Sequence, residues 1–213
     1  MIPVSSALQV RSAEKRDWLA IRDLCCQTAD SGAPIEKSRW AFFSEVWVGP
    51  YQRLVPNWTL VAEVSGRTAG YLTGCADTVH FNRLRRVLFQ FPLFIRVLAG
   101  DYPKNADTRR FIRRTLRLER SPEQRFSRRV RRQLRKKYPA HLHMNVDAEF
   151  RKEGVGRILF EKFRQELARE RVSGVHLFCG EGPLEFYRRL GFKEIASAKI
   201  SKGGRVFALG YEI

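Results

Sequence analysis

A long apolar run is missing from this sequence. No stretch reaches the roughly 18 to 20 uninterrupted apolar residues that a membrane-spanning helix needs, and Met1–Gln9 shows neither the basic leader nor the apolar core of a secretion signal. We therefore expect no membrane anchor, no secretion and a cytoplasmic location. The 213 residues, 44% of them hydrophobic, suit one α/β domain with an insertion, or at most two very small domains.

Cysteine is scarce and forms no metal-binding pattern. Cys25, Cys26, Cys75 and Cys179 show no CxxC or Cys/His spacing, and two adjacent cysteines are poorly placed to bridge each other. We expect reduced thiols and no metal site. For Cys179 we favour a buried structural thiol over a nucleophile.

Acidic residues are too few to balance the basic ones. The chain has 22 Asp plus Glu against 40 Lys plus Arg, for a formal net charge of +18. Between His80 and Tyr138 the sequence holds 19 basic against 4 acidic residues, a balance of +15. Such a basic protein attracts polyanions, among them nucleic acid, anionic lipid and phosphorylated small molecules. We interpret residues 80–138 as an arginine-rich helical insertion, in which Phe126, Val130 and Leu134 share one helix face.

Hydrophobic periodicity predicts an α/β protein. A tight turn at residues 65–67 between two apolar runs predicts a β-hairpin, and Gly191 is placed to end a short helix. The predicted strands are 8–11, 58–64, 69–75, 141–146, 175–179, 192–200 and 206–211, and the predicted helices outside the insertion are 14–28, 35–46, 156–171 and 184–190.

A glycine-containing turn joins the strand at 141–146 to the following helix. Gly154 and Gly156 let the backbone approach an anion at the helix N-terminus, and Arg151, Lys152 and Arg157 add positive charge. The turn is neither a Walker A loop nor a complete GxGxxG fingerprint. Taken alone, it is equally compatible with phosphate binding and with ordinary turn chemistry.

A second motif lies about thirty residues further on. The pair formed by Arg151-x-x-Gly154-x-Gly156-Arg157 and Phe186-Tyr187-x-x-Leu190-Gly191-Phe192 resembles the GNAT family of acetyl-CoA-dependent N-acetyltransferases. The resemblance covers about two thirds of the chain. It implies one GNAT domain over residues 1–213, of mixed α/β (α+β) class. Its mostly antiparallel central sheet would have flanking helices and splayed central parallel strands, with the basic insertion at about 80–138.

A narrower resemblance is carried by Gly70–Thr78, Tyr138–His143 and Gly174–Leu177. These segments are similar to the acetyltransferase-like domain of bifunctional O-GlcNAcases and to its free-standing bacterial relatives, in which an insertion between the third and fourth strands is expected. Two departures stand out, because those relatives usually carry an aspartate where this chain has Asn145 and an asparagine near Gly182-Pro183.

The GNAT resemblance implies acetyl-CoA as cosubstrate, held between the splayed strands with its pyrophosphate on backbone N–H groups of the glycine turn and its pantetheine along the strand. No metal is implied. The implied cofactor-binding residues are Met144, Asn145, Val146, Arg151, Lys152, Glu153, Gly154, Val155, Gly156, Arg157 and Tyr187.

Tyr187 occupies the position of the family's proton donor. A phenol stays protonated at neutral pH, so we predict it as the general acid, with a packing aromatic as the alternative. For the general base Asp77 and His143 are the leading candidates; Asp147, Glu181, Glu185 or a water chain are further options. A structural histidine is at least as good an interpretation of His143, and a turn or cap residue a better one of Asp77.

The insertion has several open interpretations. It is a lid for an acidic acceptor, a patch for nucleic acid or a membrane surface, or a plain charged face. The apolar run within residues 86–100 suits packing on the domain or a second subunit, and alternatively an anionic membrane. The predicted function is acetyl transfer to an unidentified primary amine; the alternative is a catalytically weak acyl-CoA-binding or nucleic-acid-binding module.

Overall fold

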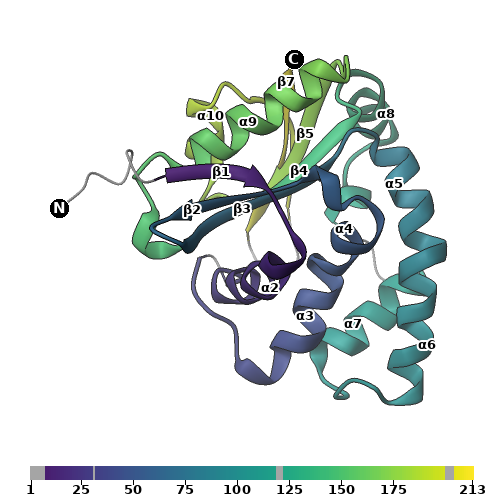
Figure 1. Cartoon of the computed structure of the whole chain (residues 1–213). Coiled ribbons are helices and arrows are strands. Elements are labelled where there is room, and N and C mark those ends of the chain that lie inside the picture. The colour runs from purple at the N-terminus through teal and green to yellow at the C-terminus, as the bar shows by residue number, and fades with distance from the viewer. Residues whose placement is uncertain (1–7, 31, 119–121, 200–203) are drawn as a thin grey trace. The chain divides into compact units, whose positions relative to one another are not determined.

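The computed structural model describes residues 8–30, 32–118, 122–199 and 204–213. Seven strands form one sheet in the order β1-β2-β3-β4-β5-β7-β6 (Figure 1). The chain divides into two compact units, Met1–Cys75 with Leu142–Arg169 and Ala76–His141 with Glu170–Ile213, and the boundary falls within β4 (Ala140–Val146). The prediction of a single domain with one insertion stays a prediction.

The first unit is built on the antiparallel strands β1 (Leu8–Ser12), β2 (Thr59–Val64) and β3 (Arg67–Cys75). Strands β2 and β3 form the predicted hairpin, with Leu60 opposite Leu72 and Val61 opposite Tyr71. Ser65 and Gly66 form its tight turn with positive φ angles of 49° and 77°. The sequence therefore predicted all three strands and the pairing of β2 with β3, but not the pairing of β1 with β2.

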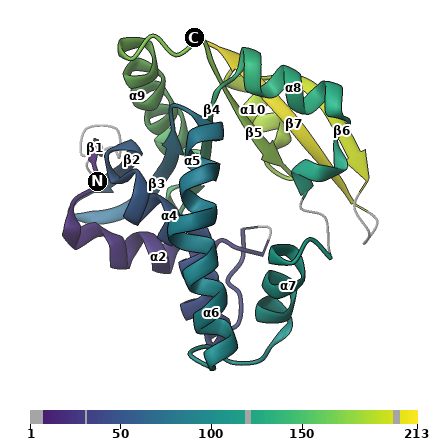
Figure 2. The same cartoon turned by 90° about the vertical axis from the view of Figure 1, so that its right-hand side faces the viewer.

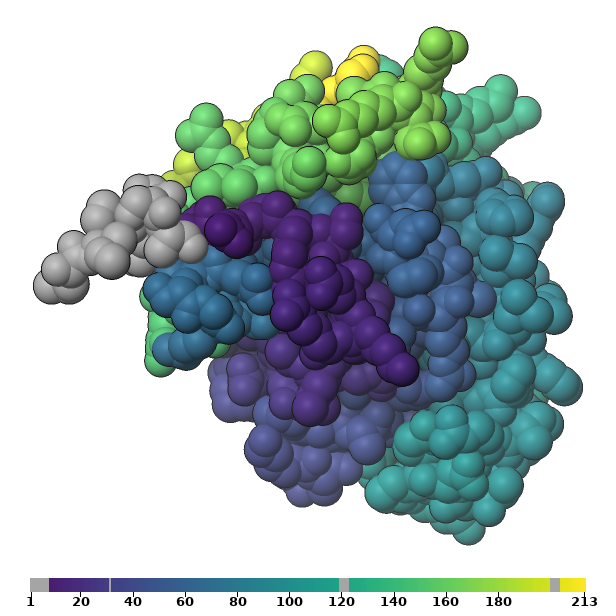
Figure 3. Space-filling view, in the orientation of Figure 1, coloured from purple at the N-terminus to yellow at the C-terminus, as the bar shows by residue number. Residues whose placement is uncertain are grey.

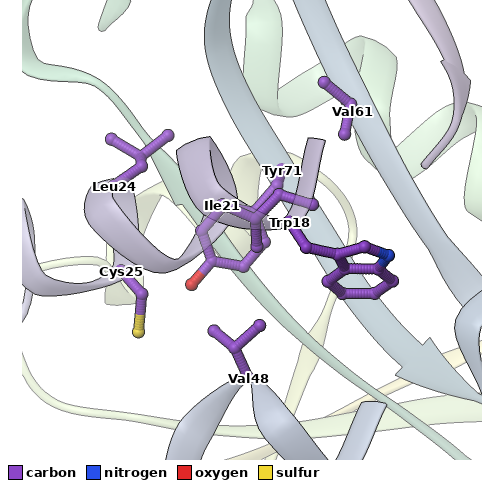
Figure 4. Close-up of a cluster of buried hydrophobic side chains, with 7 residues drawn as sticks. All are labelled: Trp18, Ile21, Leu24, Cys25, Val48, Val61 and Tyr71. Carbon is purple, nitrogen blue, oxygen red and sulfur yellow. The ribbon is translucent and has the colours of Figure 1, made fainter. Parts of the chain in front are cut away.

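Two helices cover the two faces of these strands (Figure 1). Helix α2 (Trp18–Gln27) packs on one face, where Trp18, Ile21, Leu24 and Cys25 meet Val48, Val61 and Tyr71 (Figure 4). Helix α9 (Val155–Arg169) contacts all three strands from the other face. Successive strand side chains point to opposite faces, so β3 presents Tyr71 to α2 and Gly70 to α9.

The remaining helices of the first unit lie before α2, between α2 and β2, and after β4. They are the 3-10 turns η1 (Lys15–Asp17), η2 (Lys37–Arg39), η3 (Pro56–Trp58) and η6 (Ala148–Phe150) and the helices α3 (Trp40–Trp47) and α4 (Gly49–Leu54). The sequence analysis left residues 47–57 without a helix. Pro50 lies in the first turn of α4, where a missing N–H costs no hydrogen bond.

The second unit contains the antiparallel strands β5 (Gly174–Cys179), β7 (Arg205–Glu212) and β6 (Lys193–Lys199). Helix α8 (Arg128–Lys137) lies across them (Figure 2). Phe126, Leu134 and Tyr138 form a buried cluster with Val206 and Ala208, against which Val130 packs. The predicted apolar face of this helix is thus confirmed. Of the predicted strand 192–200, residue 200 lies outside the described residues.

The rest of the insertion is helical, as predicted. A continuous helical run comprises α5 (Thr78–Leu84), the π-helical stretch η4 (Arg85–Gln90) and α6 (Phe91–Ala99); α7 (Ala106–Thr115) and the 3-10 turn η5 (Pro122–Arg125) follow. The run is apolar on two sides: Phe89, Leu93 and Val97 are buried, whereas Leu88, Phe91, Ile95 and Leu98 are exposed. No helix among the described residues has the length and apolar character to cross a membrane.

The parallel strands β4 and β5 pair over two positions only in the described sheet. Ala140 lies opposite Val175 and His141 opposite His176, and the ladder goes no further. Antiparallel pairing elsewhere and this short parallel ladder match the predicted mixed sheet with splayed central strands. Beyond His141, the backbone of β4 therefore does not pair with β5.

Candidate functional site

The glycine turn links β4 to α9 through backbone conformations that few residues adopt. Lys152 and Gly154 have φ angles of 72° and 82°. Nothing lies near the position of a Cβ on Gly154, so the positive φ alone favours glycine there. Helix α9 begins at Val155, and its first turn leaves N–H groups without intrahelical acceptors. These N–H groups and the partial positive charge of the helix end can hold an anion.

Arg151 fixes this turn to distant backbone. Its Nη2 donates a hydrogen bond to the carbonyl of Gly32 at 2.9 Å, and its Nε donates to the carbonyl of Val146 at 3.3 Å. The guanidinium also lies against Gly32, where an added Cβ would be 2.8 Å from Nη1. The sequence analysis assigned the charge of Arg151 to a cofactor phosphate; in the structure its donors hold the turn in place.

The start of α9 is packed tightly on the sheet. Val155 and Gly156 are buried. A Cβ on Gly70 of β3 would be 3.1 Å from both the Asn145 carbonyl and Cγ1 of Val155. Only a residue without a side chain allows β4 and the first turn of α9 to approach β3 this closely. The packing therefore sets the position of the glycine turn relative to the end of β4.

The exposed members of the turn are Arg151, Lys152, Glu153, Gly154 and Arg157. Arg157 lines a surface hollow of about 340 Å³ on the outer side of α9, with Val10, Ile158, Glu161, Lys162 and Gln165. The outer face of α9 is part of the molecular surface in Figure 3, and its charges are largely paired within the helix, as in Lys162–Glu166 and Arg164–Glu161.

The candidate cofactor residues of β4, Met144, Asn145 and Val146, are half-buried. The side chain of Asn145 donates from Nδ2 to the hydroxyl of Tyr71 at 2.8 Å. That hydroxyl also hydrogen-bonds the thiol of Cys25, and burial holds the pKa of Tyr71 well above its ordinary value. Tyr71 belongs to the buried cluster drawn in Figure 4 and thus orients Asn145 from the core of the first unit.

His143 lies among aromatic rings on the same strand. Its ring stacks on Trp47 with centroids 5.7 Å apart and lies 6.5 Å from Tyr71. Burial lowers the pKa of His143 to about 4, so the side chain is neutral at pH 7. The sequence analysis did not identify Trp47 or Tyr71 as neighbours, because nothing local in the sequence connects them to His143.

Asp77 lies in the second unit, where it caps a helix. Its carboxylate accepts hydrogen bonds from the backbone N–H groups of Val79 and His80, at 2.8 and 3.0 Å, at the start of α5. This is the geometry of an N-cap. The carboxylate is exposed as well, so its capping role leaves part of it accessible to solvent.

Tyr187 is buried on the short helix α10 (Leu184–Arg189), which ends before Gly191 with its φ of 96°. Its ring contacts those of Phe186 and Phe192, with centroids 5.1 and 5.6 Å apart. Burial raises the pKa of the phenol, and the nearby thiol of Cys179 adds to the increase. All four cysteines are buried, and none of them forms a disulfide.

The predicted site residues fall into two groups. His143, Met144, Asn145, Val146 and the turn 151–157 belong to the first unit, whereas Asp77 and Tyr187 belong to the second. Within the described residues, no cluster of three or more His, Cys, Asp or Glu side chains is arranged to hold a metal ion. The first group contains the exposed backbone of the glycine turn, and the second contains a buried phenol.

Comparison with known proteins assigns a class. Residues 126–194, which include the glycine turn and Tyr187, match the family model of the acetyltransferase (GNAT) domain. No curated protein matches the sequence. Among solved structures, SsHAT is 28% identical with a TM-score of 0.72, and the match covers 97% of this chain and 98% of that one.

Two further structures share the fold at lower identity. A GCN5-related N-acetyltransferase from Kribbella flavida is 17% identical with a TM-score of 0.56, over 98% of this chain and 99% of that one. The yncA protein of Salmonella typhimurium, solved with its cofactor acetyl-CoA, is 15% identical with a TM-score of 0.54, over 97% and 94%.

Residues 126–194 thus match an acetyltransferase (GNAT) domain, and the chain shares the fold of solved N-acetyltransferases, which supports an acyltransferase enzyme. The predicted family and fold are confirmed. Enzymes of this class use acetyl-CoA as cosubstrate. The narrower resemblance to O-GlcNAcase relatives stays a prediction.

Proposed function

We propose that the protein transfers the acetyl group of acetyl-CoA to a primary amine by direct attack of the amine on the thioester. The observation that carries this proposal is the glycine turn at the start of α9, inside the segment that matches the GNAT domain. Its left-handed residues and the unpaired N–H groups of the first helical turn suit the pyrophosphate of the cofactor.

The proposed cofactor contacts follow from this placement. Backbone N–H groups of residues 152–157 hold the pyrophosphate, while Met144, Asn145 and Val146 line the pantetheine and polarise the thioester carbonyl. Fixed backbone dipoles stabilise the developing oxyanion without a covalent step. The Tyr71–Asn145 hydrogen bond and the Arg151 contacts support the proposal, because they keep both segments in place.

In the proposed reaction the amine nitrogen bonds to the acetyl carbon, and the carbon–sulfur bond breaks. The amine gives up one proton to a base, and the departing thiolate takes one from Tyr187. Burial and the raised pKa of Tyr187 support this role, since they keep the phenol protonated until the thiolate develops. Solvent then returns a proton to the phenolate.

Different observations bear on each candidate for the general base. A histidine with a pKa near 4 is unprotonated at pH 7 but holds a captured proton weakly. The Asp77 carboxylate is exposed but already accepts two backbone N–H bonds. Asp147 likewise caps η6 by accepting from the N–H of Glu149 at 3.0 Å. We retain Asp77 and His143 as candidates.

The test of the cofactor site is calorimetry with acetyl-CoA. The native protein is expected to bind, and Gly156→Glu to abolish binding by placing a carboxylate in the anion site. Because Gly156 is buried, Lys152→Glu, at an exposed position, serves as a second variant, and circular dichroism confirms that both are folded. Absence of acetyl-CoA binding by the native protein would refute the proposal.

The test of catalysis is a screen of primary amines with native protein and Tyr187→Phe. Loss of the proton donor is expected to lower kcat by about 10²-fold or more, with acetyl-CoA binding retained. Equal turnover by both proteins would remove Tyr187 from the mechanism. Binding of acetyl-CoA without transfer to any amine would favour the alternative of a catalytically weak acyl-CoA-binding module.

A further inference from the structure

Helix α8 carries a concentration of positive charge that the acetyltransferase chemistry does not use. Its ten residues include five arginines and two lysines, and no acidic residue. One side of the helix, with Val130 and Leu134, is packed against β7 residues Val206 and Ala208. The helix is therefore held firmly on the sheet while its cations face outward.

Four of these arginines share one face of the helix. Arg128, Arg131, Arg132 and Arg135 are spaced i, i+3, i+4 and i+7, and together they line one surface hollow of about 330 Å³. We call this set the α8 stripe. At 1.5 Å of rise per residue the stripe is roughly 10 Å long. The sequence analysis found an arginine-rich insertion without placing its arginines; the structure brings four of them to one hollow.

The positive charge of the α8 stripe is not balanced by acidic side chains among the described residues. None of its four arginines forms an ion pair with a described residue, and the buried Nε of Arg131 has no hydrogen-bond acceptor among them. The outer face of α9 is different, since Lys162, Arg164 and Arg169 pair with Glu166, Glu161 and Glu166. The charges of α9 are those of an ordinary solvated helix face, in which each cation has a carboxylate partner. The arginines of the α8 stripe have no such carboxylate partners among the described residues.

This arrangement costs stability in the isolated protein. Like charges at i, i+3 and i, i+4 repel across the helix surface, and arginines in the first turn oppose the helix dipole. A buried donor without an acceptor adds a further penalty. All three costs disappear when an anion with several negative groups occupies the hollow.

We propose that the α8 stripe binds the phosphodiester backbone of duplex nucleic acid. Four guanidinium groups along about 10 Å match a row of phosphates better than one small anion. The hollow is lined by arginines alone, with no aromatic platform of the kind that single strands stack on. Contacts of this type are to phosphates, so binding does not depend on base sequence.

A membrane surface fits the α8 stripe less well. Interfacial helices bury an apolar face among the lipid chains beside their basic residues. The apolar face of α8 is already buried in the second unit. Its arginines can therefore reach a row of phosphates from outside, but the helix has no apolar side left to insert.

The test is fluorescence anisotropy with a labelled 20-base-pair DNA duplex and a matching RNA duplex, titrated from 50 to 200 mM salt. The stripe variant changes Arg128, Arg131, Arg132 and Arg135 to Gln. The control variant changes Arg83, Arg86, Lys104 and Arg109 to Gln, which removes the same charge from exposed positions of the same insertion. Glutamine preserves helix propensity at the seven helical positions, and Lys104 lies outside the helices.

The native protein is expected to bind either duplex with a steep salt dependence. Loss of the stripe should make the slope of log K against log salt shallower by roughly 3 to 4 and weaken binding at least tenfold at 150 mM salt. The control should weaken it no more than about threefold. The duplex should also raise the Tm of the native protein and leave that of the stripe variant unchanged.

Several outcomes would overturn the proposal. Equal weakening by the control and stripe variants would show that net charge alone attracts the duplex. Competition by polyglutamate as effective as by unlabelled duplex would show a site for acidic polymers in general. Binding to phosphatidylserine vesicles that the stripe variant loses, without duplex binding, would assign the stripe to a membrane. The acetyl-CoA measurement is independent of all these results.

Discussion

At the scale of single residues, His143 shows how burial tunes a group in the candidate site. It lies between Trp47 and Tyr71, and burial lowers its pKa to about 4. In the unfolded chain its pKa returns to about 6.5. Between these values the unfolded chain binds a proton at His143 that the folded protein does not, so folding stability must depend on pH in this window.

The sign follows from the proton count. Stability from His143 is complete above about pH 6.5 and is lost as the pH falls toward 4, because the unfolded state then gains the proton. The expected loss is on the order of 3 kcal/mol in the free energy of unfolding. Urea denaturation of native protein and His143→Phe at pH 4.5, 5.5 and 7 measures it. Phenylalanine keeps a ring against Trp47 and cannot titrate.

His176 provides an internal reference for this experiment. It is buried, its pKa is lowered in the same direction, and its Nδ1 is 2.6 Å from the carbonyl oxygen of Tyr138. It is present in both proteins, so the difference between their pH curves reports on His143 alone. Parallel curves for native protein and variant would contradict the lowered pKa.

Contacts between residues far apart in the chain, such as that of His143 with Trp47, could not be predicted from the sequence. The residue types of His143, Asn145 and Arg151 could be selected as candidates from their place beside a strand and a glycine turn. Their partners Trp47, Tyr71 and Gly32 come from parts of the chain that no local pattern connects to them. The chemistry was therefore visible in the sequence, but the contacts that orient it were not.

At the scale of elements, the glycine turn depends on one side chain. Arg151 ties it to Gly32 on one side and to Val146 at the end of β4 on the other. If the N–H groups of this turn hold the cofactor, their alignment depends on these two bonds. Loss of the anchor should therefore weaken cofactor binding without removing any group that touches the cofactor.

Arg151→Ala is expected to raise the Kd for acetyl-CoA about tenfold, since one or two hydrogen bonds from a charged donor are lost. Arg151→Lys should not restore binding, because a single ammonium cannot reproduce the planar donors that reach both carbonyls. Calorimetry measures both. Arg67→Ala is the control: Arg67 pairs with Glu149 at an exposed site nearby, and its loss should change Kd little. Full rescue by lysine would point to a direct charge contact instead.

The boundaries and types of some helices could also not be predicted from the sequence. Strands with alternating or continuous apolar residues, such as β2, β3 and β5, were predicted to within about two residues. Helix α4 was missed because Pro50 suggests a break, although proline is favoured in a first helical turn. The π-helical stretch η4 has no sequence signature that would separate it from an ordinary helix.

At the scale of the whole molecule, the chain leaves the first unit after Cys75 and returns at Leu142. These positions are neighbours in the sheet: Oγ1 of Thr73 donates to the carbonyl of His143, and the N–H of Asp147 donates to the carbonyl of Ala69. The two bonds describe an antiparallel pair, β3 with β4. Residues 76–141 thus begin and end at adjacent strand ends, where a short turn can replace them.

This topology predicts that the first unit folds without the second. Joining residues 1–75 to 142–169 through Asn-Gly forms a hairpin from β3 and β4 and retains both α2 and α9 on their faces of the sheet. Residues 1–75 alone lack α9, so Leu60 and Leu72, buried in the whole protein, lose their cover. The joined protein should show helical circular dichroism and cooperative thermal unfolding, whereas 1–75 should not. If neither folds, the first unit requires the second unit for its stability.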